Sequence, residues 1–174
     1  MAGRSWRVKR GRKATAAVVL WLLGRGLVAS ARLDGRVQRE VASWPDPSVV
    51  TLLIAPWGPR VSWRREGDSL TALGSAEVDP DLLVTFKSVD VALPCLLGMK
   101  GVLDAFAEHR STVSGDLKHA MSLLRCLHIV EGYLFPDIMT RRILPRPAER
   151  SRGHLVAYMN LLHSNAPIES GERP

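Results

Sequence analysis

The sequence predicts an α+β fold with about five strands. Three runs, 48–54, 60–65 and 69–73, are rich in branched residues or alternate between polar and apolar residues. Short turn clusters separate them, which predicts an antiparallel meander of three strands. A fourth buried run lies at 82–86. Apolar residues at helical spacing precede and follow the strands, so helices are expected on both sides of the meander in sequence.

One N-terminal helix is expected over residues 14–43, with arginines on its polar side. Gly24 and Gly26 are the points at which a break in this helix is expected. Trp44-Pro45-Asp46-Pro47 ends it, because proline has no amide donor and clashes with the preceding turn.

Two shorter helices are predicted after the fourth strand. The first begins after Ser88, an N-cap residue type, and ends at Gly98, with Pro94 expected to kink it. The second covers residues 101–107. A fifth strand is expected over residues 109–113.

The main helix begins at Ser114-Gly115-Asp116 and is expected to end at Pro136. It carries apolar residues on two faces, and a helix of that kind must bury both faces or line a cavity with one of them. The two stripes are Leu117, Ala120, Met121 and Leu124, and Leu123, Leu127, Val130 and Leu134.

Most of the net charge of +7 comes from the first thirteen residues, because removing their six basic residues leaves 7 − 6 = +1. We expect residues 1–13 to form a disordered basic tail, which is either only solvated or attracted to phosphates or anionic lipid headgroups. The residues expected to contact a membrane are Arg7, Lys9, Arg10, Arg12 and Lys13.

The N-terminus also has the outline of a secretory signal, with an apolar run at 14–23 and Ala29-Ser30-Ala31 in the place of a cleavage site. Arg25 and the continuing helical pattern favour a helix of the folded domain instead. A ten-residue run is shorter than the roughly 20 residues of a membrane span. The protein is therefore expected to be cytoplasmic or peripheral to a membrane, with export as the alternative.

The residues indicate no catalytic or metal site. His128 and Glu131, like Asp116 and His119, are three residues apart on a helix, and all four are expected to be exposed. No phosphate loop, dinucleotide fingerprint or nucleophile elbow is present in the sequence. We therefore expect no cofactor, no bound metal and no enzymatic activity.

Two kinds of residue are expected to serve the fold. Cys95 and Cys126 lie among leucines and are predicted to be buried free thiols, as in a reducing compartment. Trp44, Trp57 and Trp63 are expected to pack in the core and turns, and nucleic-acid stacking is the disfavoured alternative.

Residues 79–127 resemble the second half of the sterol carrier protein type 2 domain, and with the meander the resemblance covers about residues 24–136. It is carried by Pro80-Asp81-Leu82-Leu83-Val84-Thr85-Phe86, Asp104-Ala105-Phe106 and Val113-Ser114-Gly115-Asp116-Leu117. It implies a mixed sheet covered on one face by helices, with an apolar tunnel that holds sterols, fatty acyl chains or similar lipids. Bacterial members of that family assist the handling of quinone precursors.

The resemblance thus predicts non-catalytic binding or carrying of an apolar lipid by a domain over residues 14–145. The expected lining residues are Phe86, Leu96, Leu97, Phe106, Met121, Leu123 and Leu127. The alternative is an accessory or scaffold protein with the same fold. Apolar segments at 138–144 and 155–162, the latter in a partly helical extension over 146–174, would then pack on a partner or a second copy.

Overall fold

A computed structural model describes residues 2–134, with the side chains of 11–102 and 104–134. Its helices are α1 (Ala2–Leu33), α2 (Gly35–Ala42), α3 (Val89–Leu96), α4 (Val102–Ala107) and α5 (Leu117–Leu134). Its strands are β1 (Ser48–Ile54), β2 (Arg60–Glu66), β3 (Ser69–Gly74), β4 (Leu82–Phe86) and β5 (Ser111–Ser114). The predicted segments beyond residue 134 lie outside the described residues.

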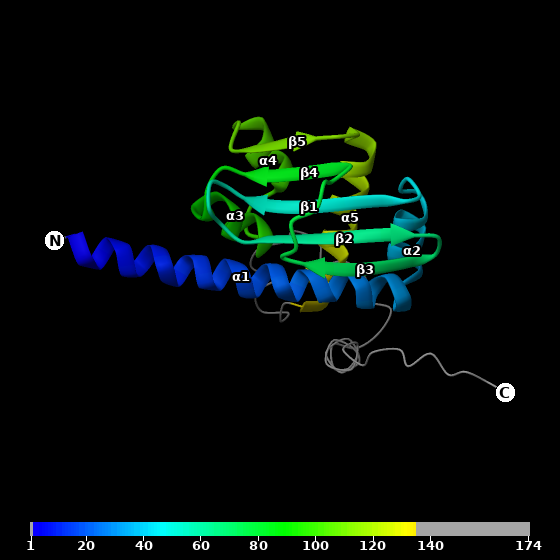
Figure 1. The fold of residues 1–174 in the computed structure, drawn as a ribbon, viewed down its shortest axis with the longest axis horizontal. Helices are drawn as coiled ribbons and strands as arrows, with labels where there is room; N and C mark the ends of the chain where they lie inside the picture. The colour runs from blue at the N-terminus through cyan, green and yellow to red at the C-terminus, as the bar shows by residue number, and fades with distance from the viewer. Residues whose placement is uncertain (1, 135–174) are drawn as a thin grey trace.

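The strands form one mixed sheet in the order β3-β2-β1-β4-β5. The meander β1-β2-β3 is antiparallel, β4 pairs parallel with β1, and β5 pairs antiparallel with β4. In Figure 1, α3 and α5 lie behind the sheet, and α1 runs along the side where β3 forms the edge. The predicted α+β fold with a five-stranded mixed sheet is confirmed.

Helix α1 is part of the hydrophobic core. Leu20, Leu23 and Leu27 are at most 1% exposed. The indole nitrogen of the fully buried Trp63, on β2, donates a hydrogen bond of 3.0 Å to the Gly24 carbonyl. Burying each leucine contributes about 1.5–3 kcal/mol to the free energy of unfolding. The packing of α1 on the sheet therefore stabilises the whole fold.

The predicted break at Gly24 and Gly26 was wrong, because α1 runs unbroken to Leu33 and the chain turns at Asp34. Both glycines lie at close contacts. An added Cβ would lie 2.8 Å from Val61 at Gly24 and 2.7 Å from Val130 at Gly26. The glycines thus serve helix packing. Asp34 has an extended backbone and accepts the Arg36 amide at 2.8 Å, which caps α2.

The N-terminal residues differ from the expected disordered tail, because α1 begins at Ala2 and its first part projects beyond the sheet (Figure 1). Arginine and lysine are good helix formers, and the segment contains no proline. By length and composition alone, Gly11–Leu33 is long and apolar enough to cross a membrane. This helical segment is longer than the ten-residue apolar run seen in the sequence. However, 56% of its most apolar window is buried inside the folded protein.

The elements after β4 follow the predicted order with shifted boundaries. Helix α3 continues through Pro94 and ends before Gly98, whose φ of +69° suits glycine. The Pro94 carbonyl accepts the amides of Met99 and Lys100 at 2.7 and 3.1 Å. Strand β5 begins at Ser111, two residues later than expected, because His109 adopts a left-handed φ of 55° after α4.

Helix α1 contains a closely packed glycine, Gly26, and a glycine with open space around it, Gly11, which allows a paired test. Gly26→Ala is expected to lower the free energy of unfolding by about 1–3 kcal/mol, because the methyl group overpacks against Val130 and Leu134. Gly11→Ala, with no atom within 4 Å, is expected to raise it by up to about 1 kcal/mol through helix propensity. Urea unfolding measures both, and stabilisation by Gly26→Ala would contradict the close packing of α1 on α5.

Candidate functional site

The structure places the seven predicted lining residues in three settings. Phe86, Leu96, Leu123 and Leu127 are at most 4% exposed and belong to the core between the sheet and the helices. Leu97 and Met121 are half-buried, and Phe106 is 45% exposed on α4. The core therefore brings four of them together and leaves Phe106 at the surface. Their role as a ligand-binding lining stays a prediction.

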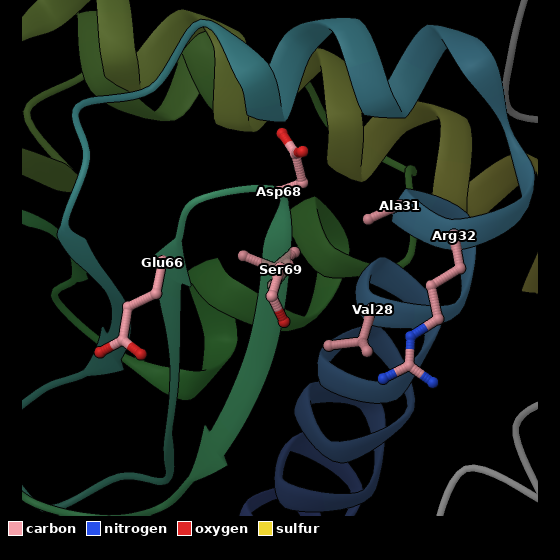
Figure 2. Close-up of a pocket in the computed structure, with 7 residues that line it drawn as sticks. Val28, Ala31, Arg32, Glu66, Asp68 and Ser69 are labelled. Atoms are coloured by element: carbon pink, nitrogen blue, oxygen red, sulfur yellow. The ribbon is translucent and has the colours of Figure 1, made fainter.

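A groove with a volume of about 450 Å³ lies between α1 and the edge strand β3. It contains none of the predicted lining residues. Its walls are Ala17, Trp21, Gly24, Arg25, Val28 and Arg32 from α1, and Pro59, Arg60, Val61, Leu70, Thr71, Ala72, Gly74 and Ser75 from the meander. A second hollow of about 370 Å³ shares Val28, Arg32 and Leu70 with it (Figure 2).

Small residues on facing elements leave this groove open. Ala17 lies on α1, opposite Ala72 and Gly74 on the β3 side, whereas Gly24 is in close contact with Val61. A side chain of one carbon or none cannot fill the space between a helix and a sheet edge. Buried Val61 and Leu70 contribute apolar surface. Sequence reasoning missed the groove, because only the packing of α1 beside β3 brings these small residues together.

Positive charge surrounds the larger groove. Its lining includes Arg25, Arg32 and Arg60 and no aspartate or glutamate. The Arg25 guanidinium lies over the ring of Trp21, 5.1 Å from the centroid, a cation–π distance. Arg60 forms an ion pair of 3.4 Å with Glu77, whose side chain is 89% exposed, so this pair contributes little.

Glu131, on α5, is buried, so the predicted exposure of this residue was wrong. Its side chain is 7% exposed and faces Gly98, where an added Cβ would lie 3.3 Å from Oε2. Burial raises the pKa of this carboxyl to about 8. His128 is exposed as predicted. The two residues therefore do not form a metal-binding pair.

His119 is a second correction, since it is 6% exposed and packs on Trp44 with ring centroids 5.0 Å apart. Burial lowers the pKa of its imidazole. Asp116, exposed as expected, accepts the His119 amide at 2.9 Å and so caps α5. Among the described residues, no group of three or more histidine, cysteine or acidic side chains is placed to hold a metal ion.

The remaining buried polar groups connect elements of the fold. The Trp44 indole donates to Ser122 Oγ at 2.9 Å, and Ser122 donates to Glu40 Oε2 at 2.7 Å. Tyr133 donates to Asp34 at 2.7 Å. Although burial alone would raise the pKa of Asp34, hydrogen bonds from Arg36 and Tyr133 hold it well below its usual range. These contacts hold α2 against α5.

Trp44 and Trp63 are buried as predicted, whereas Trp57 is 83% exposed in the turn after β1. The three tryptophans therefore form no common stacking surface. Cys95 and Cys126 are buried free thiols, which confirms that prediction. Burial raises the pKa of these thiols to about 11 and 12. Both are therefore protonated at neutral pH and lack the thiolate that a nucleophile needs.

No family model matches the chain, and neither does any curated protein. Among solved structures, it is similar to the UbiJ-SCP2 ubiquinone synthesis protein, with a TM-score of 0.46 and 15% identity over 67% of this chain and 96% of that one. Sterol carrier protein 2 from Yarrowia lipolytica, in its apo form, matches with a TM-score of 0.44 and 16% identity over 62% and 85%.

Sterol carrier protein 2 like 2 from Aedes aegypti matches with a TM-score of 0.35 and 17% identity, over 56% of this chain and 94% of that one. The structures that match thus include members of the family that the sequence resembles. Similarity at this level concerns the order of strands and helices and does not identify a ligand.

The buried carboxyl of Glu131 predicts a pH-dependent stability. Below pH 4.5 it is protonated in both states. As the pH rises toward about 8, only the unfolded state ionises, so stability falls by up to ~1.4 kcal/mol per pH unit. Above about pH 8 the carboxyl ionises in both states, so its destabilising effect no longer changes with pH.

Glu131→Gln is therefore expected to stabilise the protein increasingly from pH 5 to 8, measured by urea unfolding at each pH. Glu66→Gln, at a carboxylate that is 67% exposed, is the control and is expected to change stability little. A constant difference between Glu131→Gln and wild type across this range would contradict a buried, protonated Glu131.

Proposed function

We propose that the protein binds or carries an amphipathic lipid without catalysing a reaction, with the apolar part of the lipid in the groove between α1 and β3. The observation that supports this is the groove itself, about 450 Å³ in volume and walled largely by apolar or small residues. Ligand sites in proteins range from about 300 to 1,000 Å³.

Burial of the lipid chain supplies the binding energy. Each CH₂ moved from water into an apolar site gains ~0.8 kcal/mol. Val28, Val61 and Leu70 present apolar surface to a chain in the groove, and Trp21 is 55% exposed and available to cover it. Such binding needs few polar contacts, so the affinity depends more on the length of the lipid chain than on the shape of one functional group.

An internal tunnel between the sheet and the helices is the alternative place for the same ligand. The apolar part of the lipid would lie against Phe86, Leu96, Leu97, Met121, Leu123 and Leu127, with Phe106 near an opening. This alternative requires the core to open, because Phe86, Leu96 and Leu123 are at most 2% exposed. The groove requires no such rearrangement, which favours it.

The residues around the groove support binding over catalysis. Its described lining has arginines, two hydroxyl residues and apolar residues, and contains no histidine, cysteine or carboxylate. General acid–base catalysis at neutral pH relies on such groups. The buried thiols and Glu131 are not among the lining residues.

We also propose that the protein works in the cytoplasm and meets its ligand at an anionic membrane surface. Helix α1 contains eight basic and no acidic residues. Leu20 and Leu23 are buried in the core and are not available to contact lipid. Val18 and Trp21, 57% and 55% exposed on α1, remain for that contact. Basic residues beside an exposed tryptophan suit peripheral binding.

An accessory protein that acts through protein contacts is the second candidate. The same exposed Val18 and Trp21 support it, because a partner or a second copy would bury them as well as a membrane would. Light scattering distinguishes the two, since a monomer that binds vesicles through α1 contradicts the accessory function.

Filling the groove is expected to abolish ligand binding. Ala72→Trp places an indole in the groove, whereas Ala107→Trp, at an exposed position on α4, is the matched control. Purified wild type and Ala107→Trp are expected to yield bound lipid on extraction and mass spectrometry, and Ala72→Trp is expected to yield at least about tenfold less. Equal recovery from both variants would place the ligand elsewhere, and no lipid from wild type would overturn the proposal.

The basic end of α1 is expected to carry membrane binding. Deleting residues 1–13 removes six basic residues, each contributing about 1 kcal/mol near an anionic surface, while the buried contacts from Ala16 onward remain. The intact chain is expected to co-sediment with anionic vesicles and to be released by salt, and the deletion variant is expected to stay in solution while remaining folded by circular dichroism. Equal binding to neutral vesicles would show that charge is not responsible.

A further inference from the structure

We propose that the turn between β1 and β2 anchors the protein to an anionic membrane, with Trp57 inserted into the bilayer surface beside the basic end of α1. The inference rests on the proposed function, because it adds a second element to the membrane contact of α1. It also assigns the end of the groove between α1 and β3 that meets the bilayer.

The turn holds Trp57 outside the fold. Its side chain is 83% exposed, the largest exposed fraction among the large apolar side chains that the structure describes. Exposing so much apolar surface to water is unfavourable. An indole combines an apolar body with a polar N–H group, which suits it to the boundary between lipid and water. The exposure of Trp57 therefore fits a contact with a bilayer surface.

Hydrogen bonds order the turn around Trp57. The Ile54 amide donates to the Pro59 carbonyl at 3.1 Å, and the Gly58 amide donates to the Ile54 carbonyl at 2.7 Å. A Cβ at Gly58 would lie 2.3 Å from that carbonyl oxygen, so the turn closes in this way only around glycine. Pro56 and Pro59 restrict the backbone on both sides. An ordered turn loses little conformational entropy when it binds.

The turn lies at the same end of the molecule as the basic part of α1. Figure 1 shows α1 projecting beyond the end of the sheet at which β1 leads into β2. Pro59 of the turn lines the groove together with Ala17 and Trp21 of α1. Trp57 is two residues before Pro59. A membrane that meets Trp57 and α1 together therefore also meets this end of the groove.

Charge favours an anionic bilayer as the partner. The turn, residues 55–59, has no charged side chain, and α1 has eight basic and no acidic residues. Asp90 of α3 offsets one of these charges by pairing with Arg12. An anionic bilayer presents headgroup charge to the remaining basic residues and an interfacial layer to the indole. One flat surface thus matches both elements.

The first test compares Trp57→Ala with Leu117→Ala in the full-length chain. Leu117 is 61% exposed and follows β5, which ends at the opposite end of the sheet from the β1–β2 turn. Binding is measured by co-sedimentation with vesicles of equal parts phosphatidylcholine and phosphatidylserine. Trp57→Ala is expected to need about tenfold more lipid for half-maximal binding, because it loses the burial of one large apolar side chain. Leu117→Ala is expected to bind as wild type does, and circular dichroism checks that both variants fold.

A fluorescent label reports the contact itself. Trp57→Cys and Leu117→Cys are each labelled with a nitrobenzoxadiazole group, whose emission rises in an apolar environment. The native thiols of Cys95 and Cys126 are buried and therefore react slowly. Without vesicles, iodide is expected to quench both labels. With the same anionic vesicles, only the label at residue 57 is expected to brighten and to become protected from iodide.

The outcomes separate this inference from the proposed function. Equal binding of wild type and Trp57→Ala, with the label at residue 57 still quenched, would overturn the turn as an anchor and leave α1 as the membrane contact. No binding of wild type would overturn the proposed membrane docking together with this inference. Protection of the label at residue 57 without vesicles, or a change in oligomeric state of Trp57→Ala by light scattering, would show that protein covers Trp57 instead of lipid.

Discussion

The close packing of α1 on the sheet and on α5 is the constraint on which the rest of the structure depends. Gly24 and Gly26 let Val61 and Val130 approach the helix to distances that a Cβ would forbid. The Trp63 indole then reaches the Gly24 carbonyl at 3.0 Å, so a fully buried polar group is satisfied. Leaving such a donor unpaired costs about 1–3 kcal/mol. The free energy gained by this close packing therefore exceeds what the two glycines cost in helix propensity.

The same packing creates the groove. One face of α1, with Leu20, Leu23 and Leu27, packs in the core. On the face toward β3, Ala17 on the helix and Ala72 and Gly74 on the β3 side leave space open. One helix thus contributes to the filled core and to the groove. Its exposed large apolar side chains include Val18 and Trp21, and Trp21 is part of the groove wall.

Buried ionisable groups in this fold have two different settings. Asp34 receives hydrogen bonds from Tyr133 and Arg36, so its charge stabilises the junction of α1, α2 and α5. Among the residues that the structure describes, none donates such a hydrogen bond to Glu131, and burial raises the pKa of its carboxyl to about 8. The first group favours the folded state at neutral pH, whereas the second opposes it.

The sequence by itself determined the order of the elements, the extents of β1 and β4, the burial of both thiols and the two-sided apolar character of α5. These features depend on local spacing, which a single sequence displays directly. Only the tertiary structure decided the parallel pairing of β1 with β4, the burial of Glu131 and the groove. Each depends on residues far apart in sequence that meet on folding. The resemblance to a lipid-binding family indicated the class of ligand and placed it in the core, where Phe86 and Leu123 are buried. The open space beside β3 arises only once α1 packs there, because the small residues that leave it come from separate elements.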